Sequence, residues 1–119
     1  MLKLLLVSVD VESSKEGEKL RRYIVRKLEE LGFKKVQFSV MAGMVTKQEI
    51  KKVDNLIASL EKYRDKLWFH LLVIELQEWQ ISHEGNSRKL LSEINAYKRN
   101  EHYYSLKDIA NSRFKPLLI

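Results

Sequence analysis

Residues 4–10 read LLLVSVD, a run of six apolar or small residues closed by one acid. Side chains that would point to either side of a strand over residues 2–9 are apolar, with Leu4 and Leu6 alternating with Leu5, Val7 and Val9. A strand with two apolar faces is typical of a sheet that is covered on both sides. This stretch therefore predicts a buried strand that ends at Asp10.

Two amphipathic stretches predict helices on either side of the next strands. Residues 15–31 carry apolar side chains at helical spacing, and Gly32 stands where a helix commonly ends in a left-handed residue. Thr46 and Glu49 have the spacing of a capping box, which predicts that a second helix begins there and runs over residues 47–62.

The remaining apolar stretches predict strands. Residues 36–40 alternate between apolar and polar side chains, and residues 41–45 predict a further short strand or a hairpin after Gly43. Residues 68–76, WFHLLVIEL, are apolar on both alternating faces and therefore predict a central strand. On such a strand we interpret His70 as a histidine buried in the core.

This order of elements predicts an α+β domain over residues 1–83, with a ferredoxin-like βαββαβ antiparallel sheet and both helices on one face. Strands that are apolar on both faces require a cover on the other face as well. A second copy of the same surface is the simplest cover, so we expect a homodimer through the sheet face.

Residues 84–119 predict a C-terminal segment, helical or extended, that packs on the same domain or on the partner protomer. Residues 87–99 have helical spacing, and Ser105 with Asp108 resembles the start of a further helix. The chain closes with FKPLLI, which is apolar enough to dock as a strand on its own sheet or on the partner's.

Composition narrows the chemistry. The 119 residues include no cysteine, so disulfides, thiolate nucleophiles and sulfur-ligated zinc are excluded. The 22 Lys and Arg outnumber the 16 Asp and Glu and give a net charge of +6, which suits a partner that carries phosphate. The apolar run at the N-terminus is too short for a membrane span or signal peptide, so we expect a cytoplasmic protein without membrane contact. No HExxH motif or Gly-rich phosphate loop occurs.

Asp10 is the first candidate site residue. A carboxylate at the polar end of a buried strand is held rigidly and suits a hard cation such as Mg²⁺, which takes one or two protein carboxylates. One Asp per chain becomes a plausible site if a dimer axis brings two copies together. In the alternative interpretation, Asp10 only ends the strand or caps the next helix.

Four cations on the first predicted helix form the second candidate, because they fall in one stripe away from its apolar face: Lys15, Lys19, Arg22 and Arg26. Such a stripe can follow a phosphate backbone. Alternatively it is a solvated surface that is neutralised internally, because Glu18 with Arg22 and Arg26 with Glu30 have the spacing of ion pairs.

Three stretches together resemble one known family: LLLVSVD, the basic helix KLRRYIVRK, and LGFKKVQFSVMAG with its glycine, basic residues and Val-Gln-x-Ser-Val strand. The chain is similar over residues 2–77 to the CRISPR-associated protein two family, the small subunit of the spacer-acquisition machinery. The resemblance implies a ferredoxin-like homodimer and agrees with the architecture predicted from the residues.

The resemblance implies two activities. One is a phosphodiesterase dependent on Mg²⁺ or Mn²⁺, acting on DNA or RNA, in which Asp10 of both protomers holds the metal and Ser39 supports the site. The other is a scaffold that binds double-stranded DNA and bridges the larger CRISPR integrase subunit; single-stranded RNA is a further ligand. Four residues match the family's basic positions: Arg21, Arg22, Arg26 and Lys35.

The chain also departs from the family pattern. Val9 stands where the family often has Tyr, and Met41 stands where an aromatic residue is usual. Two alternative functions therefore stay open at this point: a small ribonuclease toxin of similar fold, and a non-catalytic interaction module.

Overall fold

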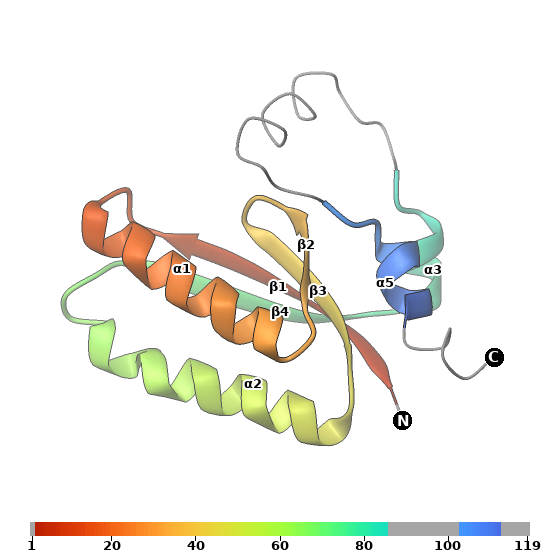
Figure 1. Ribbon diagram of the computed structural model, residues 1–119, viewed down its shortest axis with the longest axis horizontal. Coiled ribbons are helices and arrows are strands. Elements are labelled where there is room, and N and C mark those ends of the chain that lie inside the picture. Colours follow the sequence, from red (N-terminus) through yellow and green to blue (C-terminus); the bar gives the residue numbers. More distant parts are fainter. Residues whose placement is uncertain (1, 86–102, 113–119) are drawn as a thin grey trace.

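The computed structural model describes residues 2–85 and 103–112. Its strands are β1 (Lys3–Val11), β2 (Lys34–Gln37), β3 (Val40–Val45) and β4 (Phe69–Leu76). Its helices are α1 (Lys15–Glu30), α2 (Lys47–Ser59), the short 3-10 helix η1 (Leu60–Tyr63), α3 (Glu78–Ser82) and α5 (Leu106–Ser112) (Figure 1). The elements through β4 follow the ferredoxin-like order that the sequence predicts.

The four strands form one antiparallel sheet in the order β2-β3-β1-β4. β1 lies inside the sheet between β3 and β4, and it continues one residue past Asp10. The prediction that residues 68–76 form a central strand is wrong, because β4 is an edge strand that pairs only with β1. A position between two strands therefore does not explain why β4 is so apolar.

α1 and α2 cover one face of the sheet (Figure 1). The core between them contains Ile24 and Leu28 of α1, Val53 of α2 and Phe33. Both helix ends agree with the sequence. Gly32 follows α1 with φ +93°, and Thr46 and Glu49 form the reciprocal capping box that starts α2.

The turn between β2 and β3 lies where the sequence predicts an uninterrupted strand. β2 ends at Gln37, β3 begins at Val40, and the two residues between them form the turn. Gly43 lies inside β3 and pairs with Leu5 of β1, so the short strand predicted over residues 41–45 is confirmed. Phe33 packs against Gly43, and a Cβ at this position would lie 3.0 Å from the Phe33 ring. Apolar and polar side chains continue to alternate through the turn, so the pattern of the sequence does not reveal where β2 ends.

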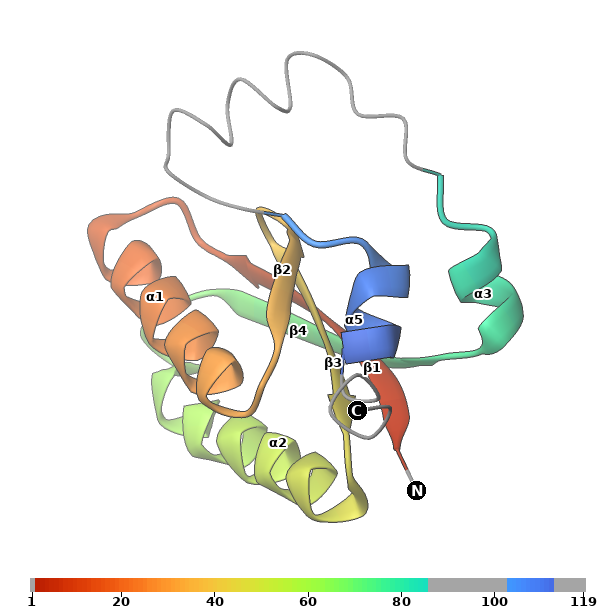
Figure 2. The same cartoon turned by 45° about the vertical axis from the view of Figure 1, so that its right-hand side comes forward.

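α5 lies on the sheet face opposite α1 and α2 (Figure 2). Its Leu106 and Ile109 form a second core with Leu4 of β1 and Ala42 of β3. Ser105 accepts a hydrogen bond from the Asp108 N–H at 3.1 Å, the contact that the sequence predicts for a helix start. The predicted helix over residues 87–99 and the terminal FKPLLI lie outside the described residues.

Two further contacts fasten this helix. The Leu106 N–H donates to Glu84 Oε2 at 2.7 Å, and the Tyr104 N–H donates to the Lys35 carbonyl at 2.8 Å on the outer edge of β2. The described part of the C-terminal segment therefore packs on its own domain, against β2 and β3 of the sheet and against α3.

The other half of this second face is open. Leu72 and Ile74 of β4 are 46% and 38% exposed there, beside Ser8 and Leu6 of β1, which are half-buried. His70 also lies on this face and is exposed, so the interpretation of His70 as a core histidine is wrong. We call the exposed area around Leu72 and Ile74 the open half-face.

Ile109 tests whether α5 is docked on the sheet in solution. The Ile109→Ala variant should lose about 2 kcal/mol of unfolding free energy in urea denaturation, because a buried isoleucine leaves a cavity when truncated. Lys107→Ala, an exposed change on the same helix, should stay within about 0.5 kcal/mol of the parent. Equal effects of the two changes would contradict the docking of α5.

Candidate functional site

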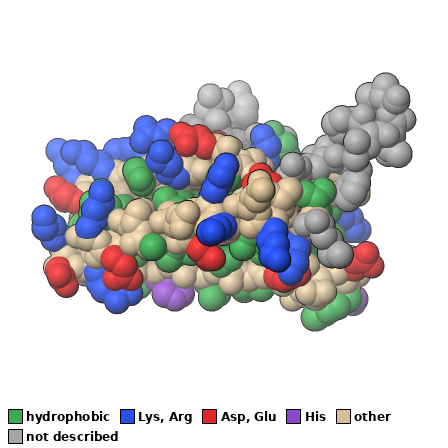
Figure 3. Space-filling model, turned by 90° about the horizontal axis from the view of Figure 1, so that it is seen from below, with side chains coloured by type: hydrophobic (Ala, Val, Ile, Leu, Met, Phe, Trp, Pro, Cys, Tyr) green, Lys and Arg blue, Asp and Glu red, His purple; other side chains and the backbone are tan. Residues whose placement is uncertain are grey.

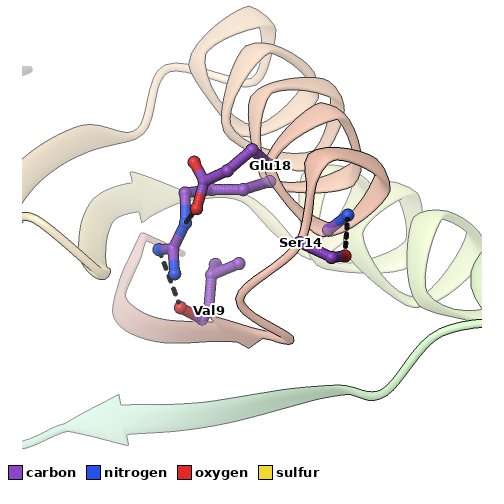
Figure 4. A network of polar contacts seen from close by, with 5 residues as sticks. Val9, Ser14 and Glu18 are labelled. Carbon is purple, nitrogen blue, oxygen red and sulfur yellow. Dashed lines mark hydrogen bonds and ion pairs between the residues drawn. The ribbon is translucent and has the colours of Figure 1, made fainter.

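The backbone N–H and C=O of Val9 are both hydrogen-bonded to residues outside β3, just past the point where the β1–β3 ladder ends. The last pair of the β1–β3 ladder is Ser8 with Val40. Beyond it, the Val9 N–H donates to the Ser39 carbonyl at 2.7 Å. The Val9 carbonyl accepts from Arg21 Nη1 at 3.3 Å (Figure 4). We call this arrangement the Val9 clamp, and it fixes the backbone directly before Asp10.

Arg21 belongs to the core and not to the outer surface of α1. Only 9% of this residue is exposed. Its guanidinium lies 4.7 Å from the centre of the Phe38 ring, a cation–π contact, and its Nε lies 3.8 Å from Glu18 Oε1, which is too long for a hydrogen bond. Arg21 therefore links α1, β1 and the β2–β3 turn through one buried charge.

Lys35 and Ser39 lie near this clamp. Lys35 Nζ lies 5.6 Å from the centre of the Phe38 ring, so this aromatic ring has a cation near it from both β2 and α1. Ser39 takes part in the clamp through its backbone carbonyl. The sequence did not single out Phe38, although an aromatic residue that is flanked by basic residues in a predicted strand was a signal for such contacts.

Asp10 points to the open side of the sheet. It lies on the same face as Ser8 and pairs across the ladder with His70, and both members of this pair are exposed. Its carboxylate forms no hydrogen bond or ion pair with any other residue in the described ranges. The alternative that Asp10 caps the next helix is wrong, because Ser14 is the cap of α1 and accepts from the Gly17 N–H at 3.0 Å.

Glu12 is an acid that the sequence did not single out, and it joins β1 to β4. Its Oε1 accepts from the Trp68 N–H at 2.9 Å, and its Oε2 accepts from the Ser14 hydroxyl at 2.7 Å. The hydrogen bond from Trp68 lowers the pKa of the Glu12 carboxyl, and the one from Ser14 lowers it further. Both carboxylate oxygens of Glu12 thus accept hydrogen bonds that stabilise the loop after β1.

The four stripe cations Lys15, Lys19, Arg22 and Arg26 are exposed along α1. No side chain of this stripe pairs with another residue in the ranges 2–85 and 103–112, so the ion pairs predicted for Arg22 and Arg26 are absent there. The acids pair instead with other bases, Glu18 with Arg21 at 3.8 Å and Glu30 with Lys27 at 3.7 Å.

The stripe and Asp10 do not form one surface. The stripe lies on the solvent side of α1, whereas Asp10 lies on the sheet face away from α1. Seen from below, several Lys and Arg side chains lie close together at the upper left of the molecule, and hydrophobic and histidine side chains occur along the lower margin together with charged ones (Figure 3). The stripe and Asp10 therefore lie on different sides of one protomer.

Comparison with known proteins gives the family. A family model described as CRISPR associated protein Cas2 matches residues 3–84, which is more than half of the chain and extends from β1 to the residues just after α3. The chain belongs to the Cas2 family. The resemblance seen in the sequence is thereby confirmed, and membership connects the protein with CRISPR adaptation. No curated protein and no solved structure matches the chain.

Two negative findings accompany this family membership. In the described part of the chain, no three or more residues of the types His, Cys, Asp and Glu come together as a potential metal-binding group. None of the helices in residues 2–85 and 103–112 has the length and apolar character needed to cross a membrane.

The Val9 clamp predicts different consequences for two neighbouring arginines. Arg21→Met keeps an aliphatic stem but leaves the Val9 carbonyl without its donor, so the unfolding free energy should fall by about 1–3 kcal/mol. The exposed Arg22→Met should change it by less than about 0.5 kcal/mol. Urea denaturation of both variants checks this difference, and a loss for Arg22→Met as large as that for Arg21→Met would argue against the clamp.

Proposed function

We propose that this Cas2-family protein acts in CRISPR adaptation as a dimeric scaffold that binds duplex DNA without reading its sequence and joins the larger integrase subunit. One observation carries the DNA part of the proposal: the α1 stripe is exposed and has no ion-pair partner among the described residues. Cations that are already paired within the protein would gain less from phosphate than these do.

The stripe has the form that a phosphate backbone requires. From Lys15 to Arg26 the cations recur on one side of a helix, over about 16 Å at 1.5 Å per residue. Flexible, exposed cations in a row neutralise phosphates and release counterions, a contribution that does not depend on base sequence. In the ordered core, by contrast, Arg21 acts on the protein itself, so the stripe and not Arg21 makes the proposed contact.

The dimer part of the proposal rests on the open half-face. Leu72 and Ile74 expose apolar surface on a sheet face whose other half is already covered by α5. Contact with a second copy would remove this surface from water, and an isologous contact needs only one self-complementary surface. Because α5 occupies the end of the face near Leu4, the dimer contact lies toward the end that carries Asp10 and His70.

Asp10 favours a second function, metal-dependent cleavage of phosphodiesters. Its exposed carboxylate has no partner among the described residues, and Mg²⁺ takes one or two protein carboxylates with water and substrate phosphate in the rest of its shell. Asp10 from two protomers fits this requirement. A bound divalent ion activates water and neutralises phosphate charge. Within this chain, Asp10 would hold the ion, and the Val9 clamp would keep the Asp10 backbone in place.

The stripe predicts a loss of affinity that is equal for all DNA sequences. Replacing Lys19, Arg22 and Arg26 by Ala should weaken duplex binding and reduce the slope of log affinity against log salt by about 0.9 for each lost phosphate contact. A matched control replaces three cations at and after η1 by Ala: Lys62, Arg64 and Lys66. Fluorescence anisotropy at several salt concentrations measures the DNA affinity of both variants. Equal losses of affinity would mean that only the net charge of the protein matters, and not the position of the stripe.

The open half-face predicts that two neighbouring residues of β4 differ in their effect on assembly. Ile74→Glu should convert the dimer to a monomer in sedimentation at micromolar concentration, because it places a charge in the contact. Val73→Glu is the matched control, since Val73 is 36% exposed against 38% for Ile74 but points to the face of the helices. A parent protein that sediments only as a monomer would refute the dimer.

Asp10 predicts a metal-dependent activity that one isosteric change removes. Labelled duplex DNA and single-stranded RNA are incubated with the parent or with Asp10→Asn, in Mg²⁺ or in chelator. Cleavage should require both Mg²⁺ and Asp10, while DNA binding and sedimentation of Asp10→Asn stay unchanged. If the parent cleaves neither substrate but binds DNA, the scaffold function stands alone.

A further inference from the structure

Asp10 is not alone at its end of the sheet, because His70 is its direct partner in the antiparallel β1–β4 ladder. Directly opposed residues project to the same face, with Cβ atoms about 4.5–5.5 Å apart. Both side chains are exposed, and neither forms a hydrogen bond or ion pair with another described residue. Asp10 and His70 thus occupy directly opposed positions on two strands, and their side-chain polar atoms contact no other described residue.

We propose that His70 provides an imidazole nitrogen beside the Asp10 carboxylate, so that the cation site of this chain prefers a transition-metal ion over Mg²⁺. The proposal rests on the proposed function for the position of the cation and adds the class of ion that the site selects. Carboxylate and water suit Mg²⁺, whereas imidazole suits ions later in the first transition series. A mixed carboxylate and imidazole pair therefore shifts the preference toward ions such as Co²⁺, Ni²⁺ and Zn²⁺.

The residues around this pair hold the ends of the two strands in place. The next pair along the same face is Ser8 with Leu72, so apolar surface of the open half-face adjoins the two ligands. On the opposite face of the same strands, Val11 and Phe69 pack toward the helices and hold the ends of β1 and β4 in register. The backbone before Asp10 is fixed by the Val9 clamp.

One protomer supplies only two protein ligands for such an ion among its described residues. The described residues contain no group of three or more His, Cys, Asp and Glu, so one chain supplies only the pair. Contact of two open half-faces would add the same pair from a second copy, and water or phosphate oxygen would supply any remaining ligands. Because the ion would join β1 to the edge strand β4, its binding should also stabilise the folded chain.

Titration calorimetry with CoCl₂ and MgCl₂ on the full chain, prepared without a histidine tag, tests this inference. The parent should bind Co²⁺ more tightly than Mg²⁺. His70→Gln should weaken Co²⁺ binding by about tenfold or more, since even the partners of metal ligands have effects of that size. Its Mg²⁺ affinity should stay within about twofold. His83→Gln removes the other described histidine, which is also exposed, and should leave both affinities unchanged.

His70→Asp gives an independent check that does not depend on losing a ligand. It replaces the imidazole by a carboxylate, so selectivity should move toward Mg²⁺, and a thermal unfolding midpoint that Co²⁺ raises in the parent should respond to Mg²⁺ instead. Sedimentation of each variant confirms that the assembly is the same.

The outcomes separate this inference from the proposed function. If Asp10→Asn loses Co²⁺ binding while His70→Gln and His70→Asp behave as the parent does, the site uses carboxylates only and the inference is wrong, although Asp10 keeps its proposed role. If Asp10→Asn binds both ions as the parent does, the cation does not lie at Asp10, and the inference and the proposed cleavage both fail. Loss of Co²⁺ affinity in both His70→Gln and Asp10→Asn, with Mg²⁺ retained in His70→Gln, supports the inference.

Discussion

The structure depends on one constraint, that β1 is apolar on both of its faces. A strand of this kind exposes hydrophobic surface until each side of its sheet is covered. The α1 and α2 layer covers one side around Val7 and Val9, and α5 covers the end of the other side around Leu4. The helices therefore lie where they cover β1 and its neighbours. The open half-face is the part of the second sheet face that α5 does not cover.

Local signals in the sequence were sufficient for most of the architecture. The capping box at Thr46 and the left-handed Gly32 act through hydrogen bonds and backbone angles of adjacent residues, so they can be recognised without knowledge of the fold. The order of strands and helices follows from the same kind of signal. The β2–β3 turn could not be recognised in this way, because apolar alternation continues across Phe38 and Ser39 and no glycine or proline marks the turn.

The place of a strand within its sheet is a different kind of information. The apolar residues of a strand do not reveal how many strands it pairs with. They also do not reveal whether another element of the same chain covers its face. For this reason residues 68–76 predicted a central strand, and His70 was interpreted as a core residue, although β4 is an edge strand and His70 is exposed. Arg21 shows the converse: its residue type indicated a surface cation, but only 9% of it is exposed, and the Phe38 ring of the β2–β3 turn lies over its guanidinium. The proposed roles of Asp10, the stripe and Ser39 are contacts with nucleic acid and metal. Neither the fold nor the pattern of the sequence determines such contacts.

The docking of α5 also bears on the order in which the chain folds. Leu106 and Ile109 reach Leu4 and Ala42 from a part of the chain that is far away in sequence. Closing such a long loop carries an entropic cost, and contacts of this kind tend to form late. During synthesis, β1 to β4 leave the ribosome before α5 does, so the whole second face of the sheet is exposed for a time. Any molecule that bound to that face before α5 docked would keep Leu106 and Ile109 from reaching Leu4 and Ala42.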